Sequence, residues 1–273
     1  MNADNIVNGY IDAHVHLVSA AGLADAIAAG VSFLRDAGTR EGTGLALTHS
    51  EEPRVLSAGW ALYPEGGYGS RFGVAIKTRE DARGEVKRLK DAGAGIIKVM
   101  ASGMVSLAER GVITPGGFDE EMLGLIVSEA SANSLKVMAH ANGGEAIIAA
   151  CEAGAISIEH GFFMTEEALD WMKQRNVLWV PTVGALHRAA GLSSAPAGAK
   201  EIAAETIKAH LKMIGKAHKL GVRLGIGTDC TLPDPKYCEA YEAELEWFRR
   251  VGIPEHEVMM MASEAGKEMF EAM

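Results

Sequence analysis

The sequence predicts an α/β fold and, within that class, a single-domain (β/α)8 TIM barrel over residues 1–273. Eight short apolar runs alternate with longer amphipathic runs almost from end to end, as strands and helices do in such a barrel. The chain of 273 residues is close to the roughly 250 that one barrel needs. No linker or low-complexity stretch divides it, so we expect one domain.

The apolar runs indicate the strands. Most are continuous instead of alternating, which is typical of parallel strands covered on both faces. They lie at residues 10–15, 32–38, 53–59, 95–101, 135–141, 155–161, 177–183 and 222–229. Neither a G-x-G-x-x-G after the first run nor a G-x-x-x-x-G-K-[ST] is present, which favours a barrel over an open nucleotide-binding sheet.

The amphipathic runs predict the helices. They lie at residues 22–30, about 41–50, 78–92, 119–133, 144–153, 165–175, about 198–220 and 236–250. Thr78, Asp119 and Thr165 stand where an N-cap is expected, because each precedes the first turn of such a run. Gly154 and Gly221 follow the last turns of two others, where glycine commonly ends a helix.

Composition and charge limit the partners and the compartment. Lys and Arg number 26 against 36 Asp and Glu, so the net charge is −10, and no long basic block is present; neither nucleic acid nor an anionic membrane is an expected partner. Three cysteines cannot form a complete disulfide set, which favours a reducing compartment. Without a secretory signal or an apolar run of bilayer length, we expect a cytoplasmic protein.

The first predicted strand carries two histidines one residue apart, in the sequence IDAHVHL at residues 11–17. Residues i and i+2 of a strand point to the same face, so His14 and His16 can reach one point. Histidine binds metals well. An isolated H-x-H pair is more often incidental, and a metal site therefore needs partners from elsewhere in the chain.

Other polar residues lie at or near the ends of later strands. In a TIM barrel all eight strands end on one face, where Lys98, His140, His160 and Asp229 would join the two histidines. Singly, each histidine is more often a structural residue, and the aspartate suits a turn or cap. Lys98 inside the apolar run IIKVM is harder to explain, because a buried ammonium is costly unless paired or neutralised. Six such placements on one face favour a functional site.

In this order the six residues resemble the metal-binding pattern of the amidohydrolase superfamily. The flanking segments are similar to those of its prolidase-like, Xaa-dipeptidase (imidazolonepropionase-related) branch: FLRDAGT, GAGIIKVMASG, LKVMAHANG, ISIEHG and RLGIGTD. The similarity runs from about residue 9 to about residue 265.

The resemblance implies a centre of two divalent metal ions, for which zinc suits the imidazole and carboxylate ligands best. His14, His16 and Asp229 would hold the more buried ion, and His140 and His160 the more exposed one. Lys98, carboxylated by carbon dioxide, would bridge both ions. The carbamate is an anion, which resolves the problem of a buried ammonium.

The resemblance also implies an activity. The protein would be a hydrolase that cleaves an amide bond of a small substrate, such as a dipeptide or an N-acyl amino acid, with a metal-bridging hydroxide. Asp229 would take the proton of that hydroxide and deliver it to the leaving amine. Three alternatives remain: a lactonase or phosphotriesterase-like esterase on the same centre, a catalytically inactive scaffold, and, less favoured because such barrels typically lack the lysine, a mononuclear deaminase.

The chain departs from this family in two respects. Relatives usually carry a small β-sandwich built from both termini, so this is either a minimal barrel or a truncated one, and an apolar flank exposed there would favour a homo-oligomer. The loop GGYGSRFG has Tyr68, and AHANG has Asn142, where relatives often have a histidine. These loops shape the pocket, so the second departure concerns the substrate.

Candidate substrate contacts follow the third, fourth and seventh strands. They are Tyr68, Arg71, Met104, Ser106, His187 and Arg188. An arginine at the rim would hold a substrate carboxylate bidentately, although a solvated loop arginine is an equally good interpretation. The other histidines are expected at the surface: His49, His210, His218 and His256.

Overall fold

Parallel strands form two sheets in the computed structural model, which describes residues 9–271. The first sheet has the order β10-β1-β2-β3, with β10 (Cys230–Leu232), β1 (Tyr10–Leu17), β2 (Val31–Asp36) and β3 (Arg54–Ser57). The second has the order β5-β4-β6-β7-β8-β9, with β5 (Gly73–Ile76), β4 (Ala61–Pro64), β6 (Ile96–Met100), β7 (Lys136–Ala141), β8 (Ser157–His160) and β9 (Leu178–Val180).

The two sheets approach each other at two places. At one of them, between β3 and the start of β6, the N–H of Gly95 donates to the carbonyl of Ser57 over 3.0 Å. At the other, residues 222–229 lie between β9 and β1: Leu224 forms a parallel bridge with Trp179, and the N–H of Ala13 donates to the carbonyl of Ile226 over 2.8 Å. The fold is therefore α/β and TIM-barrel-like, with two sheets joined by isolated backbone bonds within the described residues.

Apolar side chains fill the space between the sheets. Leu56 of β3 belongs to one buried cluster with Ile96 of β6 and Met138 of β7. Ala13 of β1 belongs to another with two residues of β9. These contacts cross from one sheet to the other, so the strands enclose a packed interior as a barrel does.

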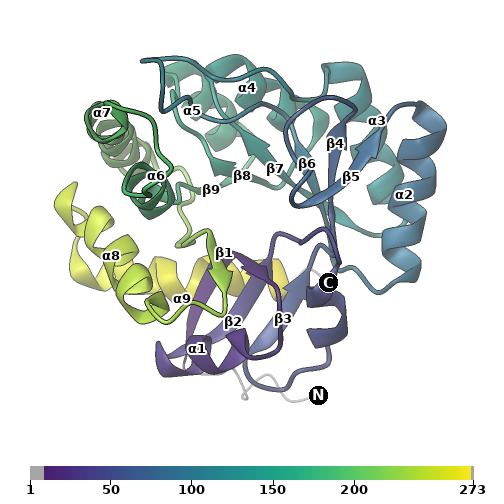
Figure 1. The fold of residues 1–273 in the computed structure, drawn as a ribbon, viewed down its shortest axis with the longest axis horizontal. Coiled ribbons are helices and arrows are strands. Elements are labelled where there is room, and N and C mark those ends of the chain that lie inside the picture. The colour runs from purple at the N-terminus through teal and green to yellow at the C-terminus, as the bar shows by residue number, and fades with distance from the viewer. Residues whose placement is uncertain (1–8, 272–273) are drawn as a thin grey trace.

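Helices surround the strands. They are α1 (Gly22–Ala28), α2 (Arg79–Asp91), α3 (Glu120–Ala132), α4 (Gly144–Ala153), α5 (Glu166–Gln174), α6 (Val183–Ala190), α7 (Ala199–Leu220), α8 (Tyr237–Arg250) and α9 (Glu255–Glu271). In Figure 1, α2 to α5 follow the six-stranded sheet, and α1, α8 and α9 lie beside the other. None of the helices searched among the described residues is long and apolar enough to span a membrane. The predicted N-caps Thr78, Asp119 and Thr165 all accept a backbone N–H bond at their helix starts.

Seven predicted strands coincide with β1, β2, β3, β6, β7, β8 and β9, but the eighth was wrong. Residues 222–229 form no regular strand, although they occupy the eighth position. A Cβ at Gly227 would lie 2.4 Å from Val180 and 3.0 Å from the Cβ of His14, so only glycine allows this close approach. The short strands β4, β5 and β10 and the helices α6 and α9 were not predicted. The expected helix at about 41–50 is a 3-10 helix at Thr43–Leu47.

Candidate metal centre

The six predicted ligands meet at one end of the barrel. His14 and His16 come from β1, Lys98 from β6, His140 from β7, His160 from β8, and Asp229 from the segment before β10. The imidazole centroids of His14 and His160 lie 5.0 Å apart, and those of His140 and His160 lie 4.5 Å apart. Lys98 interacts electrostatically with all three of these histidines.

His14, His16 and Asp229 form the tightest group. Among the residues that the structure describes, one ligand atom from each lies within 4.8 Å of the others. The Oδ1 atom of Asp229 is 3.1 Å from Nε2 of His16 and 3.6 Å from Nε2 of His14. Two imidazoles and a carboxylate converging in this way are a donor set that suits zinc.

Backbone carbonyls fix two of the imidazoles. Nδ1 of His16 lies 2.6 Å from the carbonyl oxygen of Gly38, and Nε2 of His140 lies 3.0 Å from that of Gly103. A carbonyl only accepts hydrogen bonds, so the facing nitrogen carries the proton and the other ring nitrogen keeps its lone pair. Both rings are therefore held in the tautomer that a metal ligand needs.

Side chains orient the other two imidazoles. Nδ1 of His14 lies 2.6 Å from Oε2 of Glu159, and Nδ1 of His160 lies 2.7 Å from Oγ1 of Thr182. Burial lowers the pKa of His14 to about 4 and takes the pKa of His160 well below its ordinary value. Burial likewise lowers the pKa of His140 to about 3, so these rings are neutral at pH 7, the form that binds metal.

Arg35 and Glu159 form a buried ion pair that sequence reasoning missed. From β2, the Nη2 atom of Arg35 donates to Oε1 of Glu159 over 2.8 Å, and its Nε atom donates to the carbonyl of Ala13 over 2.6 Å. Burial alone would raise the pKa of Glu159, but the charge of Arg35 and the bond from His14 hold it at about 2. The carboxylate that orients His14 is thus kept ionised by a cation from the opposite sheet. Both residues are charged side chains inside apolar runs, the signal that singled out Lys98.

We expect Arg35→Met to destabilise the fold by about 3–5 kcal/mol, because it leaves the Glu159 carboxylate buried without its cation. Chemical denaturation of the variant and the wild type measures this difference. Arg79→Met is the matched control, since Arg79 forms an exposed pair with Glu121 and should cost about 0–1 kcal/mol. Equal small losses for the two variants would contradict the assigned role of Arg35.

Lys98 lies at the centre of this end of the barrel with its side chain 1% exposed. Its Nζ atom has no hydrogen-bond partner among the described residues. Burial lowers its pKa to about 8, against the opposing charges of Glu159 and Asp229. An amine left unbonded in this position marks a group whose partner is absent from the protein itself.

Asp229 adopts a left-handed backbone conformation, with φ of 55°. The surrounding backbone holds it there: its N–H donates to the carbonyl of His14 over 2.7 Å, and the Thr228 N–H and hydroxyl both donate to Asp12, over 3.0 and 2.6 Å. Burial would raise the pKa of Asp229, but the close imidazoles of His16, His14 and His160 hold it well below its usual range. The carboxylate is therefore ionised.

A cavity of about 170 Å³ opens beside this group. It is lined by Tyr68, Met104, Val105, Leu107, His140, Asn142, His160, Phe162, Ala185, Leu186, Ala189 and Asp229. Asn142, the departure noted in the sequence, is buried, and its amide nitrogen donates to the carbonyl of Gly103 over 3.1 Å. It thereby ties the loop after β6 to the end of β7.

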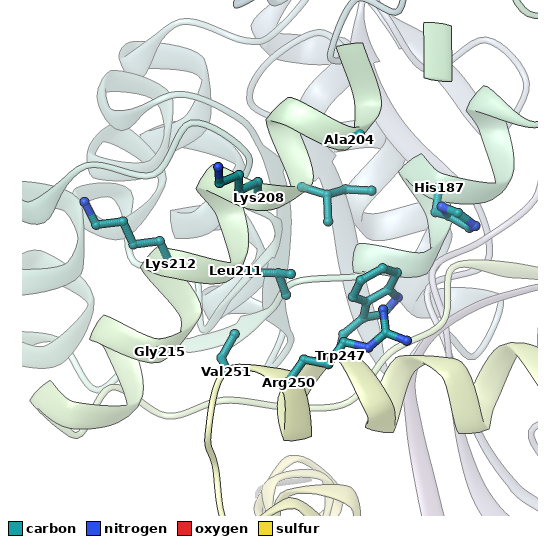
Figure 2. Close-up of a pocket in the computed structure, with 10 residues that line it drawn as sticks. His187, Ala204, Lys208, Leu211, Lys212, Gly215, Trp247, Arg250 and Val251 are labelled. Carbon is teal, nitrogen blue, oxygen red and sulfur yellow. The ribbon is translucent and has the colours of Figure 1, made fainter. Parts of the chain in front are cut away.

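The predicted substrate contacts fall into two sets. Tyr68 and Met104 line the cavity, whereas Arg71, Ser106, His187 and Arg188 do not. Arg71 is exposed and interacts with Tyr68, and the guanidinium of Arg188 donates to the carbonyl of Thr228 over 2.5 Å. His187 lines a separate groove of about 570 Å³ between α7 and α8, near the ring of Trp247 (Figure 2).

The surface expectation was wrong for His210. Its side chain is 2% exposed and stacks on Phe162, with ring centroids 4.2 Å apart. His218 is half-buried and lies 2.7 Å from a carboxylate oxygen of Glu257. Both residues lie on α7, and His210 belongs to the layer behind the cavity wall.

Residues 5–270 match the model of the amidohydrolase family. The chain belongs to this family. It is 31% identical to an ochratoxinase of Aspergillus niger over 191 residues, which cover 68% of this chain and 39% of that enzyme. The chain thus spans well under half the length of this curated relative.

Solved amidohydrolase structures share the fold. A prolidase in complex with N-methylphosphonate-L-proline is 25% identical with a TM-score of 0.81, covering 97% of this chain and 74% of that one. The Aspergillus niger ochratoxinase structure is 26% identical with a TM-score of 0.74, covering 93% and 69%. A Xaa-Pro dipeptidase with bound methionine, at 22% identity and a TM-score of 0.81, shares the fold over 97% of this chain and 75% of that one. The resemblance to the prolidase-like branch is thereby confirmed.

Proposed function

We propose that the protein is a metal-dependent hydrolase that cleaves the amide bond of a small substrate, a dipeptide or an N-acyl amino acid, at a centre of two divalent ions. The observation that carries this proposal is the unbonded amine of Lys98. It is buried where four oriented imidazoles and one ionised carboxylate converge. Such a donor set fits divalent cations, zinc best of all.

The donor set divides into two groups. His14, His16 and Asp229 would hold one ion, and His140 and His160 would hold the other. Lys98 would bridge the two after its neutral amine adds to carbon dioxide, which gives a carbamate and releases a proton. This replaces a buried cation by an anion, so the lysine no longer opposes metal binding.

The residues around the cavity suit amide hydrolysis. When bound, two divalent cations would lower the pKa of a water molecule and polarise the substrate carbonyl. Asp229, ionised and facing the cavity, would accept the proton of the attacking water and return it to the leaving nitrogen. Burial raises the pKa of Tyr68 above its ordinary value, so its hydroxyl stays protonated and would donate a hydrogen bond to the substrate.

Protein prepared with zinc and bicarbonate is expected to hold two ions per chain, because the ligands form two groups with one shared lysine. Elemental analysis measures the ratio, and a chelator should abolish hydrolysis that zinc then restores. Dipeptides and N-acyl amino acids are assayed beside lactones and phosphotriesters.

Each outcome of this experiment is informative. Full activity with one ion per chain would contradict the binuclear centre. Hydrolysis of lactones or phosphotriesters alone would show that the enzyme cleaves an ester bond and not an amide bond. Two bound ions without any hydrolysis would favour a scaffold over an enzyme.

A further inference from the structure

The cavity beside the candidate metal centre has two chemically different sides. His140, His160 and Asp229, with Tyr68 and Asn142, form the polar part of its lining. The rest of the lining is apolar and comes from three segments: Met104, Val105 and Leu107 of the loop after β6, Phe162 after β8, and Ala185, Leu186 and Ala189 of α6. A substrate whose amide lies on the polar side therefore places a neighbouring group against apolar side chains.

Within the described part of the chain, no lysine or arginine is among the residues that line this cavity. Three arginines lie within three residues of its lining in sequence, and none of them is part of it: Arg188 donates to the carbonyl of Thr228, Arg110 pairs with Glu205, and Arg71 is exposed. A carboxylate on the apolar side would thus be buried without a cation, which is costly. The cavity disfavours acidic groups there.

The size of the cavity limits what fits. Its volume is about 170 Å³. Cavities of about 150 Å³ lined by aliphatic and aromatic side chains hold one benzene ring. One phenyl ring or one branched alkyl chain therefore fits.

The α6 wall is anchored from behind. The N–H groups of Val183 and Gly184, in the first turn of α6, donate to the two carboxylate oxygens of Glu244 over 2.7 and 2.8 Å. Glu244 is buried on α8. A wall fixed at its N-terminus discriminates by size, because it cannot retreat to admit a larger group.

We propose that the substrate carries one compact apolar group, a phenyl ring or a branched alkyl chain, beside the scissile amide, and that Leu186 and Ala189 of α6 select it. This inference rests on the proposed amidohydrolase function. It assigns the apolar side of the cavity as the specificity site and excludes substrates with an acidic group at that position.

The first test compares the zinc-loaded protein on matched substrates. N-acetyl-L-phenylalanine and N-acetyl-L-leucine are paired with N-acetyl-L-glutamate, and N-benzoylglycine with N-succinylglycine, so that either side of the amide is covered. In at least one pairing, kcat/KM for the apolar compound should exceed that of the acidic one by at least about tenfold, since one methylene in an apolar pocket is worth roughly 10–200-fold. Equal or reversed values in both pairings would overturn the inference.

The second test places bulk on the α6 wall. Ala189→Phe should reduce the ratio of kcat/KM for the phenyl substrate to that for N-acetylglycine by at least about tenfold. Leu192→Phe adds bulk just beyond α6, where Leu192 is 61% exposed, and should change this ratio by less than about twofold. An equal change of this ratio in both variants would show that α6 does not determine the substrate specificity.

A binding measurement separates this inference from the proposed function. Calorimetry on the zinc-loaded protein compares hydrocinnamate with glutarate, which share a carboxylate but differ in their other end. Hydrocinnamate should bind at least about tenfold more tightly, and Ala189→Phe should abolish that preference. Loss of the preference in the wild type overturns the inference whether or not amides are hydrolysed. An intact preference without hydrolysis of any amide overturns the proposed function alone.

Discussion

Lys98→Met is expected to give a folded protein that loses most of its metal and almost all of its hydrolytic activity. Methionine fills a similar apolar space without a buried charge, so a lysine with a purely structural role would be replaced at little cost. If Lys98 bridges two ions as a carbamate, the variant lacks an anion at the centre. Metal content and hydrolysis of the variant, measured beside the wild type, distinguish these roles.

Two further variants sharpen this experiment. Lys98→Ala leaves a gap, and a short carboxylate such as acetate or propionate should restore part of its activity by supplying the missing anion. Lys136→Met changes an exposed lysine at the start of β7 and should alter neither metal content nor hydrolysis. Full metal content and activity in Lys98→Met would end the carbamate model.

Asp229→Asn should lower kcat by about 10²–10⁴-fold, the usual contribution of a general base. The amide keeps an oxygen to face the ions but cannot accept the proton of the attacking water, so metal content should fall much less than turnover. Asparagine tolerates the left-handed backbone at this position about as well as aspartate, so the local structure should survive.

Steady-state kinetics and elemental analysis of this variant make the comparison. Asp170→Asn, an exposed change of the same kind on α5, serves as the control. Turnover equal to wild type in Asp229→Asn would show that the carboxylate shapes the segment before β10 without moving a proton.

The parts of the fold that sequence predicted are those that local pattern determines. Continuous apolar runs identified seven strands, because parallel strands that are covered on both faces consist mostly of apolar residues. The eighth failed because the approach of Gly227 to His14 depends on β1, more than 200 residues away along the chain. The start of α6 has no side-chain cap of its own and is held by Glu244 from α8, so no local signal precedes it.

The candidate site shows the same division. Its six ligands could be proposed from the sequence because each lies in or just after a predicted strand. Arg35 and Glu159 were missed because their pairing spans 124 residues and crosses the barrel interior. The burial of His210 follows from helical periodicity: Ala203, Ile207, Ile214 and Ala217 share its helical face and are all buried.

Because the strands form two sheets, metal binding would also affect the stability of the fold. His14 and His16 belong to the four-stranded sheet, and Lys98, His140 and His160 belong to the other. In the proposed centre one ion would take ligands from both sheets, whose backbones are joined by isolated hydrogen bonds within the described residues. The bound ions would then link the two sheets, and the free energy of metal binding would add to the free energy of folding. At a free metal concentration 100 times the Kd, one such site adds about 2.7 kcal/mol. At low metal concentration the protein would therefore lose stability as well as hydrolytic activity.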